Sequence, residues 1–316
     1  MALVAIVLLG ITAPVALSQT YPSRPVRIVV GFAAGGTTDI IARIVAPKLS
    51  ERFGQPVIVE NRPGGESIIA AQTVANASPD GYTILLVTSS SITVLPHTRK
   101  RLPYDPFKDF VHVAQIAHGS FVLAVNLTVP AANVAELIAL ARSKPGKLSY
   151  ASGSETGYLT AEMFKLATGT DAIHVPYKGV APASTDLLSG QVDMMFATLS
   201  PVIPYLQAHR LKALAVTGEK RSAVLPGVPT LAESGVTNFE SSTSFGISVP
   251  SATSPAVVQR LSNDVAAVLQ MPDVVEKLLV QGVEPGARTP EQFTAYLRAE
   301  SEKFRGVLQR IGSKPQ

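Results

Sequence analysis

Four residues between two apolar segments have the composition of an anion-binding turn. Gly35, Gly36, Thr37 and Thr38 follow the apolar run at 26–30 and precede isoleucines and leucines at helical spacing. The N-terminus of a helix offers free N–H groups and the positive end of its dipole, both of which suit a carboxylate or a phosphate. A plain tight turn is the alternative, because two glycines alone also predict a turn.

Two further segments rich in Ser, Thr and Gly also follow predicted strands. They contain Ser89, Ser90 and Ser91 after the strand at 83–88, and Ser152, Ser154 and Thr156 after the strand at 148–151. Ligands of open α/β sheets bind outside the carboxyl ends of the strands. Three such segments together therefore favour a ligand cleft over three unrelated turns.

Motifs of the common enzyme classes do not occur in the sequence. We find no G-x-S-x-G elbow, no phosphate-binding P-loop and no G-x-G-x-x-G fingerprint. The chain has no cysteine, and its five histidines are isolated from one another and from carboxylates at ligand spacing. The sequence therefore predicts neither a metal nor a cofactor. A triad built from distant residues stays open, because triads are recognised by geometry.

Composition narrows the class of protein further. The 316 residues are 46% hydrophobic and only 16% charged, against about 25% charged on average, which indicates a well-buried globular chain. The 27 Lys and Arg and the 23 Asp and Glu residues are scattered along the sequence. No basic patch or arm of the kind that binds nucleic acid is present, so we expect no nucleic-acid partner.

The first 18 residues are typical of a secretory signal peptide. Residues 1–18 carry no charged side chain, contain an apolar run too short to span a bilayer, and end with small residues at Ala16 and Ser18. This pattern predicts cleavage before Gln19 and export. A buried N-terminal helix is the alternative. No other window approaches the length of a transmembrane helix.

Alternating apolar and amphipathic segments predict an α/β fold. Strands are expected at 26–30, 57–60, 83–88, 111–116, 121–125, 148–151, 173–175, 192–196, 213–216 and 244–249. Helices are expected from Thr38 onward and at 67–77, 134–142, 158–168, 183–188, 201–209, 256–270, 273–281 and 290–311. Thr38 or Asp39 is available to cap the first helix, and the last three helices are expected to follow one another without strands between them.

A long distinctive run follows the signal segment, YPSRPVRIVVGFAAGGTTDIIARIVAPKLSERFGQPVIVENRPGG. It closely resembles the opening of the Bug family, the extracytoplasmic solute receptors of tripartite tricarboxylate transporters. The resemblance continues through SPDGYTIL, HVPYKGVAPASTDLLSGQVDMMF, LKALAVTGEKRS, LPGVPTLAESG and TPEQFTAYLRAE, and so covers essentially all of the chain after the signal segment.

The resemblance implies a type II periplasmic-binding-protein fold, in which two α/β domains joined by two crossing strands close over a ligand cleft. We expect a first domain formed by 19–120 and 246–316, with the C-terminal helices in its second segment, and a second domain at 121–245. The strands near 118–123 and 244–249 are the candidate crossings.

The resemblance also implies that the first loop cradles a ligand carboxylate. The candidate ligand-binding residues are Phe32, Ala33, Ala34, Gly35, Gly36, Thr37, Thr38, Asp39, Ser89, Ser90, Ser91, Ser152, Ser154, Thr156, Lys178 and Ala197. For Lys178 the alternative is a solvated surface lysine, and for Asp39 it is capping of the helix that starts beside it.

Three features depart from the family pattern and leave the identity of the ligand open. The loop at 152–157 is about two residues shorter than usual, and Tyr158 stands where His is common. Ala197 replaces a common Asp, and Ser244 a common Trp.

We therefore expect a monomeric periplasmic receptor that binds a small carboxylate without altering it and delivers it to the membrane permease subunits of a tripartite tricarboxylate-type transporter. A secreted α/β enzyme and a ligand-dependent signalling receptor are the alternatives.

Overall fold

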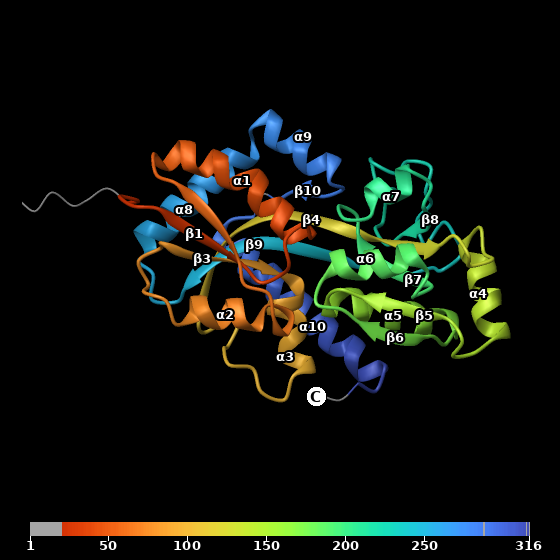
Figure 1. Ribbon diagram of the computed structural model, residues 1–316. Helices are drawn as coiled ribbons and strands as arrows, with labels where there is room; N and C mark the ends of the chain where they lie inside the picture. Colours follow the sequence, from red (N-terminus) through yellow and green to blue (C-terminus); the bar gives the residue numbers. More distant parts are fainter. Residues whose placement is uncertain (1–20, 287, 314, 316) are drawn as a thin grey trace, which may run out of the picture.

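The computed structural model describes residues 21–286, 288–313 and 315 and consists of two lobes (Figure 1). The predicted signal segment at 1–18 lies outside these residues. Strands of the two lobes join in one mixed sheet with the order β2-β1-β3-β9-β4-β7-β5-β6, and β8 and β10 pair with β4 at its sides. The predicted α/β class is confirmed. No helix in the described ranges is both long enough and apolar enough to cross a bilayer.

Three parallel strands and their helices build the first lobe. The strands are β1 (Val26–Val30), β2 (Val57–Asn61) and β3 (Thr83–Thr88), and the helices between them are α1 (Thr37–Phe53) and α2 (Ile68–Ala75). Side chains alternate across β1 as strand geometry requires: Ile28 packs against α1, and Val29 packs against α2 on the opposite face. The apolar run that predicted β1 therefore corresponds to a strand covered on both faces.

The second lobe repeats this two-sided arrangement. Its strands are β5 (Ser149–Ser152), β6 (Ile173–Pro176), β7 (Met194–Thr198) and β8 (Leu211–Val216), and its helices are α4 (Val134–Ser143), α5 (Glu155–Thr168), α6 (Val180–Ser189) and α7 (Ile203–Gln207). One apolar cluster lies between the sheet and α4 and α5, and another lies on the face covered by α6 and α7.

A single long strand, β4 (Phe110–Asn126), runs through both lobes (Figure 1). It pairs with β9 (Ser242–Pro250) as far as Ser120, and from Phe121 onward it pairs with β7. The prediction of two separate strands here was wrong. Gly119 and Ser120, which resemble a turn in the sequence, stay extended because they pair with β9.

The C-terminal segment returns to the first lobe. It contains α8 (Pro255–Leu269), α9 (Pro272–Val280) and α10 (Pro290–Arg310). A short strand, β10 (Glu284–Pro285), pairs with β4 between α9 and α10, so the prediction of helices without intervening strands was wrong. The end of α10 reaches the second lobe, where Phe304 and Leu308 pack in one cluster with Leu159 of α5.

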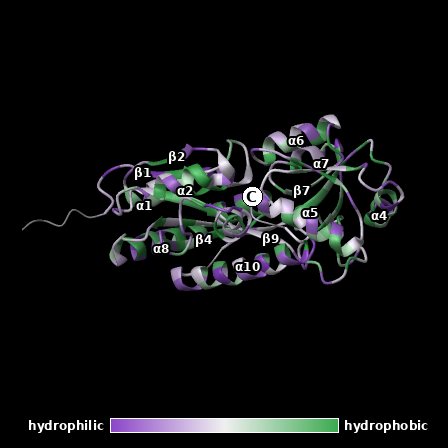
Figure 2. Cartoon of the chain, turned by 90° about the horizontal axis from the view of Figure 1, so that it is seen from below, coloured by the Kyte–Doolittle hydropathy of each residue, from purple (hydrophilic) through white to green (hydrophobic). Residues whose placement is uncertain are grey.

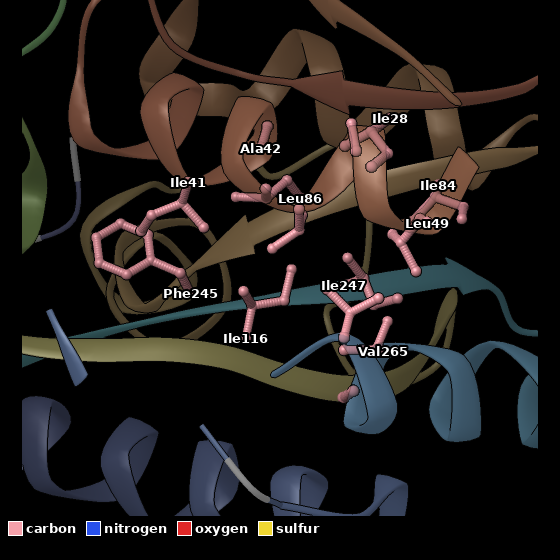
Figure 3. Packing of buried hydrophobic residues seen from close by; sticks show 14 of the residues in the cluster. Ile28, Ile41, Ala42, Leu49, Ile84, Leu86, Ile116, Phe245, Ile247 and Val265 are labelled. Atoms are coloured by element: carbon pink, nitrogen blue, oxygen red, sulfur yellow. The ribbon is translucent and has the colours of Figure 1, made fainter. Parts of the chain in front are cut away.

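The largest apolar cluster lies beneath α1. Its side chains come from α1, β1, β3, β4, β9 and α8, and they meet in one layer (Figure 3). The central strands are mostly hydrophobic, whereas α10 alternates hydrophobic and hydrophilic residues along its length (Figure 2). Phe245 belongs to this cluster and also borders the cavity described below, so the core directly supports one wall of the candidate site.

Candidate ligand-binding site

A small cavity lies where the two lobes meet. The first lobe and β9 contribute Phe32, Ala33, Gly36, Thr37, Thr38, Thr88, Ser90, Thr243 and Phe245. The second lobe contributes Gly153, Ser154, Thr156, Gly179, Val180, Ala181 and Thr198. Its volume is about 40 Å³, which is room for only a few water molecules. This free volume is small for an organic acid.

The N-terminus of α1 points its free N–H groups at this cavity. The helix starts at Thr37, and Gly36 is the N-cap in extended conformation (φ −79°, ψ 163°) without a side-chain cap. The expectation that Thr38 or Asp39 caps the helix was wrong. Within the described ranges the N–H groups of Thr37 and Thr38 have no hydrogen-bond acceptor. They are available to a ligand, and the helix dipole favours an anion there.

Asp39 holds the loop in front of this helix. Its buried carboxylate accepts hydrogen bonds from the N–H of Gly35 at 3.0 Å, from Arg43 Nε at 3.0 Å and from Asn61 Nδ2 at 2.9 Å. Burial opposes ionisation, but these hydrogen bonds outweigh it and lower the pKa of Asp39 below its usual value. The N–H of Gly35 is therefore already hydrogen-bonded within the loop. The donors left for an anion are the N–H groups of Thr37 and Thr38.

A hydrogen bond between two threonines links the lobes beside the helix. The hydroxyl of Thr37 lies 2.7 Å from the hydroxyl of Thr198, which is the last residue of β7, and both side chains are buried. These residues belong to opposite lobes, so the contact joins the two lobes directly beside the cavity.

The three serines after β3 do not form the predicted loop. They begin a π-helical turn (Ser90–Val94) that continues into α3 (Leu95–Thr98), and such turns often occur at functional sites. Ser89 Oγ accepts a hydrogen bond from the N–H of Ser244 at 2.9 Å, and Ser91 bonds back to Thr88. Of the three serines, only Ser90 lines the cavity.

A second helix N-terminus, that of α5, meets the cavity from the opposite lobe. Ser154 is its N-cap and accepts a hydrogen bond from the N–H of Gly157 at 3.1 Å. The helix starts at Glu155, three residues before the predicted start, because Ser154 supplies the cap inside what reads as a loop. The hydroxyl of Thr156 is buried at the cavity without a hydrogen-bond partner among the described atoms. Buried polar groups are nearly always paired, so this hydroxyl is a candidate ligand contact.

The remaining candidate residues lie beside the cavity rather than in its wall. The residues in this position are Ala34, Gly35, Asp39, Ser89, Ser91, Ser152, Lys178 and Ala197. Lys178 is exposed, and the backbone that follows it, from Gly179 to Ala181, lines the cavity instead. Ala197 packs in the apolar cluster under α6 and α7, and Ser152 Oγ lies 2.7 Å from His174 Nε2.

Several residues of the cavity wall were not predicted, although some of them carry a partial signal in the sequence. Thr88 and Thr198 are the last residues of β3 and β7, directly at the carboxyl ends of strands where a ligand is expected. Thr243 and Phe245 belong to β9, which returns from more than a hundred residues away, and no local pattern predicts that return. Gly153 reaches the site because its backbone packs directly against Gly179 and Val180.

The cavity wall combines hydroxyl groups and free N–H groups with apolar surface. None of the residues that line it, all within the described part of the chain, carries a charge. Donors of this kind bind a carboxylate through hydrogen bonds to the anion and the helix dipole, without an arginine. In the described ranges no group of three or more His, Cys, Asp or Glu side chains is arranged to hold a metal ion.

Comparison with known proteins agrees with this geometry. The family model "Tripartite tricarboxylate transporter family receptor" matches residues 41–313. Protein BugT of Bordetella pertussis is 36% identical over 309 residues, covering 96% of this chain and 94% of BugT. A UPF0065 protein encoded in the gbd 5' region of Cupriavidus necator is 37% identical over 308 residues, covering 96% of this chain and 93% of that protein.

Solved structures of related proteins superpose over nearly the whole chain. Rpa4515 of R. palustris, solved with adipate, has a TM-score of 0.91 and 37% identity, covering 94% of this chain and 100% of that chain. The periplasmic binding protein BugD has a TM-score of 0.88 and 33% identity, covering 94% and 100%. MatC of Rhodopseudomonas palustris, with bound malate, has a TM-score of 0.86 and 29% identity, covering 91% and 100%.

These matches confirm both the resemblance seen in the sequence and the type II periplasmic-binding-protein fold that it implies. The protein belongs to the Bug family of tripartite tricarboxylate transporter receptors.

Proposed function

We propose that this protein is a periplasmic receptor that captures a small organic acid by its carboxylate and releases it unchanged. The observation that carries the proposal is the pair of free N–H groups at Thr37 and Thr38, which face an uncharged, hydroxyl-lined cavity between the lobes. Proteins of the same fold were solved with adipate and with malate, and both ligands are carboxylates.

In this proposal the carboxylate binds at α1 and the rest of the acid extends toward α5. The residues that we place around it are Phe32, Ala33, Gly36, Thr37, Thr38, Ser90, Ser154 and Thr156. Asp39 acts on the ligand indirectly, because it fixes the loop that leads into α1. Membership of the receptor family supports delivery of the acid, by a monomer, to the permease subunits of a tripartite transporter.

We also propose that the lobes move as two domains, formed by 19–120 with 246–316 and by 121–245. The change of partner along β4 supports the boundary at 120, because Ser120 pairs with β9 and Phe121 pairs with β7. The small volume of the closed cavity supports a hinge motion, since an acid enters only when the lobes part.

A screen for ligands tests the proposal. Full-length protein expressed in a bacterium should be exported and cut before Gln19, so the intact mass of the periplasmic protein verifies the processing. This mature protein is then heated with each member of a library of small carboxylates. A true ligand at 100 times its dissociation constant stabilises by about 2.7 kcal/mol, which is a clear shift in the melting temperature.

The best acid should leave the incubation chemically unchanged, and it should reduce the radius of gyration measured by small-angle scattering. A library in which no carboxylate raises the melting temperature would refute the proposal. A ligand that binds without any change of radius would refute the hinge motion only.

A further inference from the structure

Glu66 reaches from the first lobe to the N-terminus of α5. Its Oε2 accepts a hydrogen bond from the N–H of Glu155 at 3.2 Å, and Ser90 Oγ accepts from the same N–H at 3.2 Å. Glu155 is the first residue of α5 and lies between Ser154 and Thr156, which both line the ligand cavity. Glu66 therefore places a carboxylate beside the α5 end of the cavity.

The backbone adopts an unusual conformation to bring Glu66 there. Glu66 and Ser67 follow two glycines and have φ angles of 59° and 78°, in the left-handed region that residues other than glycine rarely adopt. Close packing holds them in place, because a Cβ atom on Gly31 would lie 1.9 Å from Ser67 Oγ. Such conformations persist where the surroundings enforce them, and they cluster at ligand sites.

Glu66 lines a second, polar chamber that adjoins the ligand cavity at Ser154. The charged and titratable groups that face Glu66 in this chamber are Arg99, Glu155, Tyr158 and His174. Arg99 forms an ion pair with Glu155 at 2.5 Å, so one of the two carboxylates already has its counter-ion. Burial lowers the pKa of His174, which favours its neutral form. With both glutamates ionised, the chamber carries a net negative charge.

Partial burial, together with the charge of Glu155, raises the pKa of Glu66 to about 7. The positive charge of Arg99 lowers the pKa of Glu66, but its effect is smaller than those of burial and of Glu155. Glu66 is therefore negatively charged in mildly alkaline solution and takes up a proton as the pH falls through about 7.

We infer that Glu66 is a specificity-determining residue that rejects a second carboxylate at the α5 end of the ligand. The preferred ligand then has one carboxylate, bound at α1, and a neutral hydrogen-bonding group at its other end. The unpartnered hydroxyl of Thr156 is placed to bond that group. This inference rests on the proposed function and narrows its ligand class to monocarboxylates.

Shape-matched ligand pairs test the inference. Each linear dicarboxylic acid of three to eight carbons, adipic acid included, is compared with its own monoamide, which has the same length and one charge fewer. At pH 8 calorimetric titration of the wild-type protein should give about tenfold tighter binding of the monoamide than of the diacid. The reason is that the carboxylate of Glu66 repels the second carboxylate of the diacid but not the neutral amide.

Glu66→Gln should reduce this ratio to about twofold or less. The amide oxygen of Gln can still accept the hydrogen bond from Glu155, so the contact between the lobes is kept. Glu276→Gln, which removes an exposed carboxylate from α9, is the matched control and should leave the ratio as in wild type.

The wild-type protein alone provides a second readout. The preference for the monoamide over the diacid should decrease as the pH is lowered from 8.5 to 6. Glu66 becomes protonated in this interval, while the ligand carboxyls, with pKa values of about 4 to 5, stay ionised. The inference is overturned if the wild type binds the diacid as tightly as the monoamide at pH 8, or if Glu66→Gln leaves the ratio unchanged. If no member of any pair binds, the inference is overturned, whereas the proposed function is refuted only if no carboxylate in the library raises the melting temperature, so the two failures are distinguishable.

Discussion

Gly36→Asp should abolish binding of the acid and leave the folded protein at least as stable as wild type. Gly36 is the N-cap of α1 in extended conformation, and a Cβ atom there meets only the carbonyl oxygen of Ala33, at 3.4 Å. Asp is among the best N-cap residues, so its carboxylate should bond the free N–H groups of the first turn. The variant would fill the anion site with its own side chain.

The loss of affinity should be large because two effects act together. The ligand loses hydrogen bonds to its charged group, each of which contributes about 1.5–3 kcal/mol, and it meets a like charge at the same place. We expect a decrease of about 100-fold or more, measured by calorimetric titration, with an unchanged or higher melting temperature.

Two variants at the same position serve as controls. Gly36→Ala adds a Cβ atom without a capping group and should bind nearly as tightly as wild type. Gly36→Asn has the shape of Asp without the charge and should fall between the two. Retention of wild-type affinity by a folded Gly36→Asp variant would exclude α1 from the binding site.

Gly153→Ala should damage the second lobe and the site together. The backbone at Gly153 packs so closely on the next loop that a Cβ atom would lie 2.4 Å from the nitrogen of Val180 and 2.5 Å from the carbonyl carbon of Gly179. These are backbone atoms, so the contact can be relieved only if the loop at Gly153 or the loop at Gly179 moves. Overpacking of this kind costs about 1–3 kcal/mol.

The same shift should reduce the affinity for the acid about tenfold or more, because both loops line the cavity. Denaturant unfolding and calorimetric titration measure the two effects. Gly306→Ala is the matched control: Gly306 lies in α10 with no neighbouring atom within 4 Å of an added Cβ, and Ala in a helix is about 0.5–1 kcal/mol more favourable than Gly. A Gly153→Ala variant as stable as wild type would contradict the close packing of the two loops.

The first part of the site could be predicted from the sequence because it is local. The apolar run VRIVV, the glycines and the start of α1 follow one another within a few residues, and β1 has the predicted bounds. The role of Asp39 depends partly on contacts that are close in the sequence and partly on a contact that is distant in it. Its contact with Gly35 lies within the loop, whereas Asn61 comes from the end of β2.

Other parts of the site could not be predicted because they depend on tertiary pairing. Phe245 enters the cavity wall only because β9 inserts between β3 and β4. The predicted start of α5 was three residues too late. The residues at 152–157 are rich in Ser, Gly and Thr, which is typical of a loop, although Ser154 is the N-cap of the helix. The family departures at Tyr158, Ala197 and Ser244 lie next to the cavity but outside its wall.

Amide NMR shows whether the N–H groups of Thr37 and Thr38 bind the carboxylate of the ligand. Spectra of the mature protein are recorded during titration with the best acid from the screen. We expect the amide protons of Thr37 and Thr38 to shift strongly downfield as they gain a charged acceptor, and the methyl ester of the same acid to leave them in place. If the acid saturates the protein without moving these two resonances, its carboxylate does not bind at the N-terminus of α1.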